Sequence, residues 1–344
     1  MAGFSIFERI YFRMKNILLF LTISFLFLSS CTNSEKKPFY VSPSELTELD
    51  LKIHRYGKAL FDLDTSNLQM ELKSIQNEFR LFLGANLNDA ENVQQIHDFV
   101  SDTQLIFIYR KTMEVYPNLD DAEEELSDAF SRYRYFFPNN KLPEVYTYIS
   151  DLYYEKPVLQ TDQAVVIALD VYLGSSFPLY QQLGLPFYKV RCMEPANLAV
   201  DVMKTLYFNE LAPKYKQRTL LDRMIGSAKV LLYLDAVLPI TPDSLKICYT
   251  AEKLEWAQKN EESVWAFLVG NQLLYTTDYQ TQTKLIQDGP FTTGFSNKSP
   301  SRLGIYIGWQ IVKSYISRHP EVSLEQFLQM TDSQKILQES GYKP

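Results

Sequence analysis

The sequence predicts a mostly helical α+β protein, with a helical N-terminal lobe and a second lobe that contains a small antiparallel sheet. Apolar residues recur at three- and four-residue steps through most of the chain after residue 44, which is typical of amphipathic helices. Two segments instead resemble strands: residues 144–149 alternate apolar and polar positions, and residues 164–169 form a short β-branched run.

The first 30 residues are typical of a bacterial lipoprotein signal peptide. Lys15 precedes an apolar run, Ile17 to Leu28, of about twelve residues, which is shorter than the roughly twenty that a transmembrane helix needs. The run ends in Leu28-Ser29-Ser30-Cys31, which resembles a lipobox, so Cys31 is the predicted lipidation site. An ordinary secretory signal or a short N-terminal anchor is the alternative, and Met14 could be the true start instead of Met1.

Residues 31–43 are polar, contain Pro38 and are predicted to form a flexible tether. In the lipoproteins that the motif resembles, the cysteine carries three acyl chains, and two or more chains anchor a protein stably in a bilayer. Residue 32 is threonine rather than the aspartate that retains many lipoproteins at the inner membrane. We therefore expect a body in the periplasm, with the outer membrane favoured over the inner.

The composition of the mature chain excludes nucleic acid as a partner. Without residues 1–30, which hold one acidic and three basic residues, 31 Lys and Arg face 40 Asp and Glu, a net charge of −9. No Pro/Gly/Ser linker interrupts the rest, so residues 44–344 are predicted to form a single globular domain, with a helical lobe at 44–140 and a mixed lobe at 141–344. Cys192 and Cys248 could form a disulfide in the periplasm, but two buried thiols are the favoured interpretation.

The helical lobe contains two well-marked helices. Ser66 can cap a helix with apolar positions from Leu68 to Phe79, and Gly84 can end it. A second helix starts after Asn118, with acids in its first turn. Its acidic run, Asp120 to Glu125, could be a metal or partner site, but an apolar stripe beneath it favours a solvated face.

The mixed lobe begins with the two predicted strands, joined by a turn at residues 159–162. Helical periodicity then returns over five segments, residues 198–208, 218–238, 250–260, 261–275 and 302–318. Thr241-Pro242 places a cap residue before a proline at a first helical position.

Sequence motifs of known catalytic chemistry are missing from the chain. It has no G-x-S-x-G, P-loop, G-x-G-x-x-G or H-E-x-x-H motif. His54, His97 and His319 have no metal-ligand spacing. We therefore predict no catalytic residue, no metal site and no cofactor beyond the lipid on Cys31.

The loop from Gln287 to Ser301 is the most suggestive candidate surface, because it is long and carries aromatic and basic residues. The predicted cleft or partner-binding residues of this loop and the following helix are Phe291, Phe295, Lys298, Arg302, Tyr306 and Trp309. A connecting loop that buries its own phenylalanines is the alternative. Gly304 and Gly308 are predicted to let another helix pack closely.

Four ordered segments carry a resemblance to a known family: residues 168–174 (ALDVYLG), 185–191 (LPFYKVR), 232–239 (LYLDAVLP) and 299–312 (SPSRLGIYIGWQIV). With the lipobox, they make the chain similar to the gliding-motility lipoprotein family GldB of Bacteroidota. The resemblance implies a membrane-anchored periplasmic lipoprotein that is needed for surface gliding and linked to type IX secretion. Its partners would be other envelope proteins of gliding and secretion.

The order of segments also resembles a zinc metallopeptidase scaffold that has lost its metal ligands. Residues 197–210 take the place of the H-E-x-x-H helix but lack histidine, and residues 225–229 take the place of a glutamate-bearing segment. Without ligands the chain cannot hold zinc and activate water. The resemblance implies a catalytically inactive, metallopeptidase-like scaffold that binds a chain or partner; a divergent periplasmic hydrolase or a small-molecule-binding lipoprotein are the alternatives.

Overall fold

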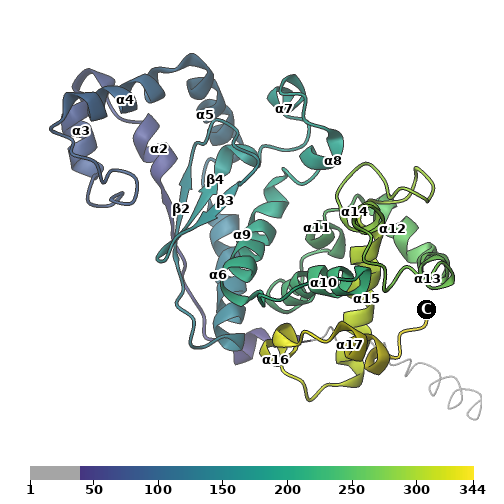
Figure 1. Ribbon diagram of the computed structural model, residues 1–344. Helices are drawn as coiled ribbons and strands as arrows, with labels where there is room; N and C mark the ends of the chain where they lie inside the picture. Colours follow the sequence, from purple (N-terminus) through teal and green to yellow (C-terminus); the bar gives the residue numbers. More distant parts are fainter. Residues whose placement is uncertain (1–38) are drawn as a thin grey trace, which may run out of the picture. The chain divides into compact units, whose positions relative to one another are not determined.

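Four strands form the sheet of the fold, in the order β1-β2-β4-β3. The computed structural model describes residues 39–344, which lie within one compact unit, and the predicted signal peptide and Cys31 fall outside them. β1 pairs parallel with β2 and β2 parallel with β4, whereas β3 is antiparallel to β4 (Figure 1). The strands are β1 (Ile53–Arg55), β2 (Glu144–Tyr148), β3 (Val158–Gln160) and β4 (Ala164–Ala168).

The sheet is therefore mixed, and the prediction of an antiparallel sheet is wrong for the β1–β2 and β2–β4 pairs. Residues 53–55 were expected in the helical lobe, because three residues are too few to show strand alternation. The turn predicted at 159–162 overlaps β3 instead. Because β3 pairs at the far side of β4, the chain reverses twice between β2 and β4, and these two strands run in the same direction. The mostly helical α+β class is confirmed.

β4 is buried on both of its faces. Val165 and Ile167 belong to the larger hydrophobic cluster of the protein, whereas Ala164 and Val166 belong to a smaller one. A strand between two apolar layers needs no polar face, which explains the uninterrupted run AVVIA.

Helices α2, α3 and α4 supply the smaller cluster with buried residues such as Leu60, Leu72 and Val100. The helix predicted over residues 68–79 ends at Ile75, and Phe79 is buried in the turns that follow. α5 lies next to α2 and adds Leu105 to the larger cluster. The bounds are α2 (Tyr56–Phe61), α3 (Leu68–Ile75), α4 (Ala90–Ser101) and α5 (Thr103–Val115).

Four helices contribute many buried residues to the larger cluster: α6 (Asp120–Phe136), α9 (Leu198–Leu206), α10 (Leu220–Val237) and α15 (Leu303–Arg318). In Figure 1, α6 and α9 lie beside the sheet, and α10 lies against α15. Gly308 confirms the predicted close packing, because a Cβ there would lie 2.7 Å from the carbonyl carbon of Met224 in α10. Trp309 Nε1 donates to Asp235 Oδ2 (2.8 Å) in the same buried interface.

The remaining helices are short and connect or cover these four. Pro242, predicted as the first helical residue after a Thr241 cap, is instead the N-cap residue of α11, and the helix begins one residue later, at Asp243. The helix expected to reach residue 275 ends at Gly270. The bounds are α7 (Pro178–Gln182), α8 (Phe187–Val190), α11 (Asp243–Ile247), α12 (Ala251–Lys259), α13 (Glu261–Gly270), α14 (Tyr279–Ile286), α16 (Leu324–Gln329) and α17 (Ser333–Ser340). Single turns of 3₁₀ helix are η1 (Pro43–Glu45), η2 (Thr65–Asn67), η3 (Leu169–Val171) and η4 (Pro195–Asn197), and η5 (Tyr207–Leu211) is a π-helical turn.

A disulfide joins Cys192, after α8, to Cys248, at the end of α11. Their Cα atoms are 5.8 Å apart and 56 residues separate them in the sequence. The favoured prediction of two buried thiols is therefore wrong. Spacing alone could not decide it, because the bridge depends on the tertiary structure that brings Cys192 next to Cys248.

Candidate functional site

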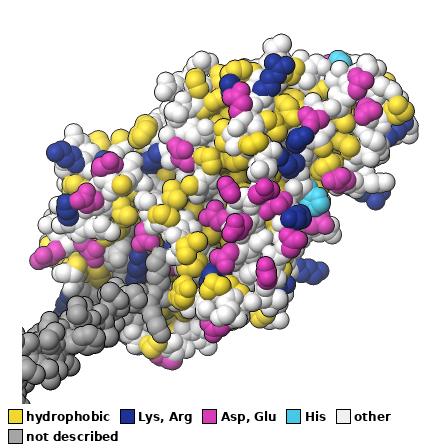
Figure 2. Space-filling model, turned by 180° about the vertical axis from the view of Figure 1, so that it is seen from behind, with side chains coloured by type: hydrophobic (Ala, Val, Ile, Leu, Met, Phe, Trp, Pro, Cys, Tyr) yellow, Lys and Arg dark blue, Asp and Glu magenta, His cyan; other side chains and the backbone are white. Residues whose placement is uncertain are grey.

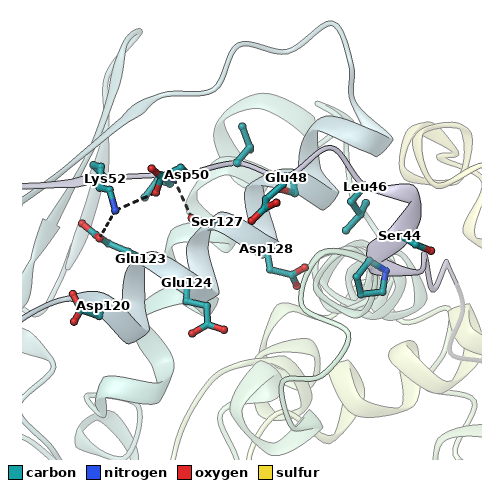
Figure 3. A pocket seen from close by; sticks show the side chains of 14 residues that line it. Ser44, Leu46, Glu48, Asp50, Lys52, Asp120, Glu123, Glu124, Ser127 and Asp128 are labelled. Atoms are coloured by element: carbon teal, nitrogen blue, oxygen red, sulfur yellow. Dashed lines mark hydrogen bonds and ion pairs between the residues drawn. The ribbon is translucent and has the colours of Figure 1, made fainter.

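A groove of about 690 Å³ runs along α6, between this helix and residues 43–52, which lead into β1. We call residues 43–52 the connecting segment and the hollow the α6 groove. Figure 3 shows acidic side chains on both of its walls, from the connecting segment and from α6. Its charged lining residues are Glu48, Asp50, Lys52, Asp120, Glu123, Glu124 and Asp128.

α6 fixes the connecting segment at both of its ends. Arg132 Nη1 donates to the carbonyl of Val41 (2.7 Å), and the backbone N–H of Leu51 donates to Ser127 Oγ (3.1 Å). The N–H of Ile53 donates to Glu123 Oε1 (2.9 Å). An irregular segment needs such partners for its backbone polar groups. Val41 is buried, so the packed body already includes residues that were expected in the flexible tether.

The α6 groove keeps a negative charge. Lys52 pairs with Asp50 (3.1 Å) and Glu123 (3.3 Å), and hydrogen bonds to these two carboxylates, Asp50 first, raise the pKa of Lys52. Three other carboxylates that line the groove, those of Glu48, Asp120 and Glu124, form no ion pair with any residue in 39–344. Figure 2 shows acidic side chains gathered in the middle of this side of the molecule.

Positively charged side chains are the groups that this arrangement can bind. The acids Asp120, Glu123 and Glu124 occupy the first turns of α6, where the helix dipole stabilises them. Across residues 39–344, no three His, Cys, Asp or Glu side chains are placed to share a metal ion. An open groove in which three carboxylates are outside ion pairs favours a lysine- or arginine-bearing segment through complementary charge.

The six residues predicted for partner binding do not form one surface. Phe291 and Lys298 are exposed on the loop, but Phe295 is half-buried, with its ring centroid 4.9 Å from that of Phe267. Tyr306 and Trp309 are buried in α15 and cannot reach a partner, so assigning them to a cleft is wrong. The loop does bury one of its own phenylalanines, as the alternative expected.

Arg302, the sixth of these residues, holds the base of the loop. Its backbone is left-handed (φ 58°), and its Nε lies 3.6 Å from the carboxylate of Asp288. Arg191 Nη2 (3.0 Å) and Ser301 Oγ (2.8 Å) donate to the same carboxylate. Burial lowers the pKa of Arg191, and the negative charge of Asp288 opposes this shift. Arg191 Nε also donates to the carbonyl of Cys248 (2.8 Å), so this cluster is tied to the disulfide.

Three carboxylates that could serve a hydrolase accept hydrogen bonds from different donors. Glu194 accepts from the backbone of Ser175 (2.7 Å), and Asp201 accepts from the hydroxyl of Tyr172 (3.0 Å). Glu210, in the π-helical turn η5, accepts from Tyr133 and lines a polar hollow of about 550 Å³. None of these partners is shared between the three acids.

An apolar pocket of about 330 Å³ lies between α2, α4 and the carboxyl end of β2. Its lining includes Tyr56, Phe61, Phe99 and Ile149. The carboxyl ends of parallel strands are a common place for ligands, although this volume is at the small end for ligand pockets.

The sequence identified the acidic run on α6 but interpreted it as a solvated face. What it could not show is the second wall, because residues 43–52 have no periodicity. The hydrogen bonds of Ile53 to Glu123 and of Leu51 to Ser127 span 70 and 76 residues of sequence. A row of carboxylates becomes a groove only when another segment crosses it.

The comparison with protein families finds a match. A sequence model of a protein family, described as gliding motility protein GldB, matches residues 37–344. Neither the curated proteins nor the solved structures include a match to the chain, so the resemblance to metallopeptidases stays a prediction. Within residues 39–344, no helix combines the length and apolarity needed to cross a membrane.

Proposed function

Because the chain belongs to the GldB family of gliding motility proteins, we propose that it serves surface gliding as a lipid-anchored envelope protein that binds other proteins and catalyses no reaction. In this proposal Cys31 carries the lipid, the body lies in the periplasm at the outer membrane, and the partners belong to gliding and type IX secretion. The protein then needs no metal and no cofactor.

The α6 groove is the observation that supports a binding role. Its carboxylates come from two segments, and those of Glu48, Asp120 and Glu124 remain outside the ion pairs of the described residues. Unpaired surface charge speeds and orients association with a segment of opposite charge. We therefore expect the partner to present lysine or arginine side chains to this groove.

Neutralising the unpaired carboxylates tests the proposal. The variant Glu48→Gln/Asp120→Asn/Glu124→Gln should fold normally, since no intramolecular ion pair is lost. It should lose its crosslinked partner in cells and glide more slowly. The measurements are crosslinking followed by identification of the captured protein, and the speed of cells on a surface.

A matched variant controls for net charge. Glu155→Gln/Glu262→Gln/Glu325→Gln also removes three exposed carboxylates, but from other parts of the surface. It should retain both partner and gliding. Equal behaviour of the two triple variants would contradict a role for the α6 groove.

A divergent hydrolase is the alternative function, and a different triple variant separates it from binding. Alanine at Glu194, Asp201 and Glu210 should leave gliding intact in our proposal. Loss of gliding with normal folding and normal partner capture would favour catalysis.

A further inference from the structure

Four aromatic side chains gather where the described chain begins. Phe39 contacts Phe136 at the end of α6 with ring centroids 6.3 Å apart, and Tyr135 contacts Phe136 at 5.2 Å. Tyr40 follows Phe39 in the chain, and its ring centroid lies 6.0 Å from the guanidinium carbon of Arg132, which is one helical turn before Phe136 on α6. Tyr40 is 52% exposed and Tyr135 is 49% exposed. We call Phe39, Tyr40, Tyr135 and Phe136 the aromatic rim.

The length of chain before the rim limits its distance from the anchor. Residues 32–38 separate Cys31 from Phe39, and the fully extended chain from Cys31 to Phe39 spans at most about 29 Å. The rim is also fixed to the body, because Arg132 holds the carbonyl of Val41. The rim therefore cannot lie farther than this span from the point where the Cys31 lipid enters a bilayer.

The chemistry of the rim suits a lipid surface. Tyrosine places an apolar ring and a polar hydroxyl at the level of the headgroups. Lys36 and Lys37 precede Phe39 in the sequence, against one acid, Glu35, and Arg134 lies beside Tyr135. Basic residues next to an anchor are attracted to anionic lipids.

The acidic groove does not oppose this contact, because its charged residues on α6 lie nearer the N-terminal end of the helix than the rim does. Its last acidic residue, Asp128, precedes Phe136 by eight positions, which is about 12 Å along the helix. The Debye length is about 8 Å at physiological ionic strength, so most of the groove charge is screened at the rim. Glu45, in η1, is the closest acid of the connecting segment, and its carboxylate is occupied by the backbone N–H of Ser42 (3.1 Å).

We propose that the aromatic rim rests on the membrane that holds the Cys31 anchor, with Tyr40 and Tyr135 among the lipid headgroups. This inference rests on the anchor of the proposed function, but not on the partner. It makes the C-terminal end of α6 the membrane-facing end of the body, and it presents the α6 groove away from lipid.

A single fluorophore tests the contact in the full-length, lipidated protein. Cys192 and Cys248 are bridged and Cys31 is acylated, so the cysteine of Tyr135→Cys is the free thiol for an environment-sensitive label. The protein is reconstituted in vesicles of phosphatidylethanolamine and phosphatidylglycerol, with and without lipids that carry a quencher near the headgroup. Met70→Cys is the control, because Met70 is 59% exposed on α3, among the helices of the smaller cluster.

The label at position 135 should lose emission about twofold in quencher vesicles, as expected for an interfacial aromatic position, while the label at position 70 should not change. Equal emission at position 135 with and without quencher, in vesicles that carry the protein on flotation, would overturn the rim contact and leave the anchor standing. Failure of the protein to float with vesicles would overturn both.

Discussion

At the scale of single residues, Lys229 is a charged group inside the core. Its side chain is fully buried in α10, and its ammonium donates to the carbonyls of Leu328 (2.9 Å) and Met330 at the end of α16. The ring centroids of Tyr215 and Phe327 lie 5.6 and 5.9 Å from Lys229 Nζ. Burial lowers the pKa of Lys229 to about 8. The charge thus links α10 to the C-terminal helices at a cost in desolvation.

We expect the difference in stability between the natural protein and the variant Lys229→Met to depend on pH. The folded protein releases this proton near pH 8, but the unfolded chain holds it up to about 10.5. Between these values the unfolded state binds more protons, so the free energy of unfolding of the natural protein should rise with pH relative to the variant. From pH 7 to 9.5 the gain should be about 2 kcal/mol.

Urea denaturation of both proteins at the two pH values measures this gain. A difference between the natural protein and Lys229→Met that does not change with pH would show that the ammonium is solvated in the folded state.

At the candidate site, residue types could be used to predict charged and exposed side chains, but not which aromatic side chains are buried. The acids of α6 and the exposed Phe291 and Lys298 could be named from their types and neighbours. Trp309 could not be placed, because its hydrogen-bond partner Asp235 is 74 residues away and aromatic side chains suit both cores and surfaces. Burial of a particular side chain depends on tertiary contacts that local patterns do not contain.

At the scale of elements, the packing of α10 on α15 depends on one glycine. A Cβ on residue 308 would overlap the carbonyl oxygen of Met224, which belongs to helix backbone and cannot move alone. Gly308→Ala should therefore lower the free energy of unfolding by roughly 2–3 kcal/mol through overpacking. Chemical denaturation of the purified variant gives this value.

Gly270→Ala is the matched control for this prediction. Gly270 is the last residue of α13, and nothing lies within 4 Å of an added Cβ. The change should be neutral or stabilise by up to about 1 kcal/mol, because alanine has the higher helix propensity. A similar loss of stability in both variants would contradict the role of the contact with Met224, because an added Cβ at residue 270 meets no neighbour.

Long helices and the two five-residue strands could be predicted from periodicity, and their observed ends lie within about three residues of the expected ones for α9, α10, α12 and α15. β1 and β3 could not. Each has three residues, and each is an edge strand whose structure is defined by hydrogen bonds to its neighbour. Parallel pairing also depends on contacts far apart in sequence, as between Ile53 and Val145.

At the scale of the whole molecule, the disulfide constrains a large part of the chain. Closing the 56-residue separation between Cys192 and Cys248 removes unfolded-state entropy worth about 4 kcal/mol in the chain-entropy account. Reductant should therefore lower the unfolding midpoint of the natural protein in urea. The Arg191 and Asp288 cluster should loosen as well, because it is tied to the carbonyl of Cys248.

The variant Cys192→Ser/Cys248→Ser separates the bridge from other effects of reductant. It should unfold at the lower midpoint with or without reductant. An unchanged midpoint of the natural protein after complete reduction would show that packing alone determines this region.

The connecting segment has a consequence for the order in which the protein matures. Ribosomes make it early, yet the side chains of Glu123 and Ser127 that fasten it are made 70 and 76 residues later. A nascent or truncated chain that stops before α6 leaves residues 43–52 open to proteases, whereas a completed chain shields their backbone. Cleavage in this stretch would therefore distinguish unfinished molecules from finished ones before any of them is tested for motility.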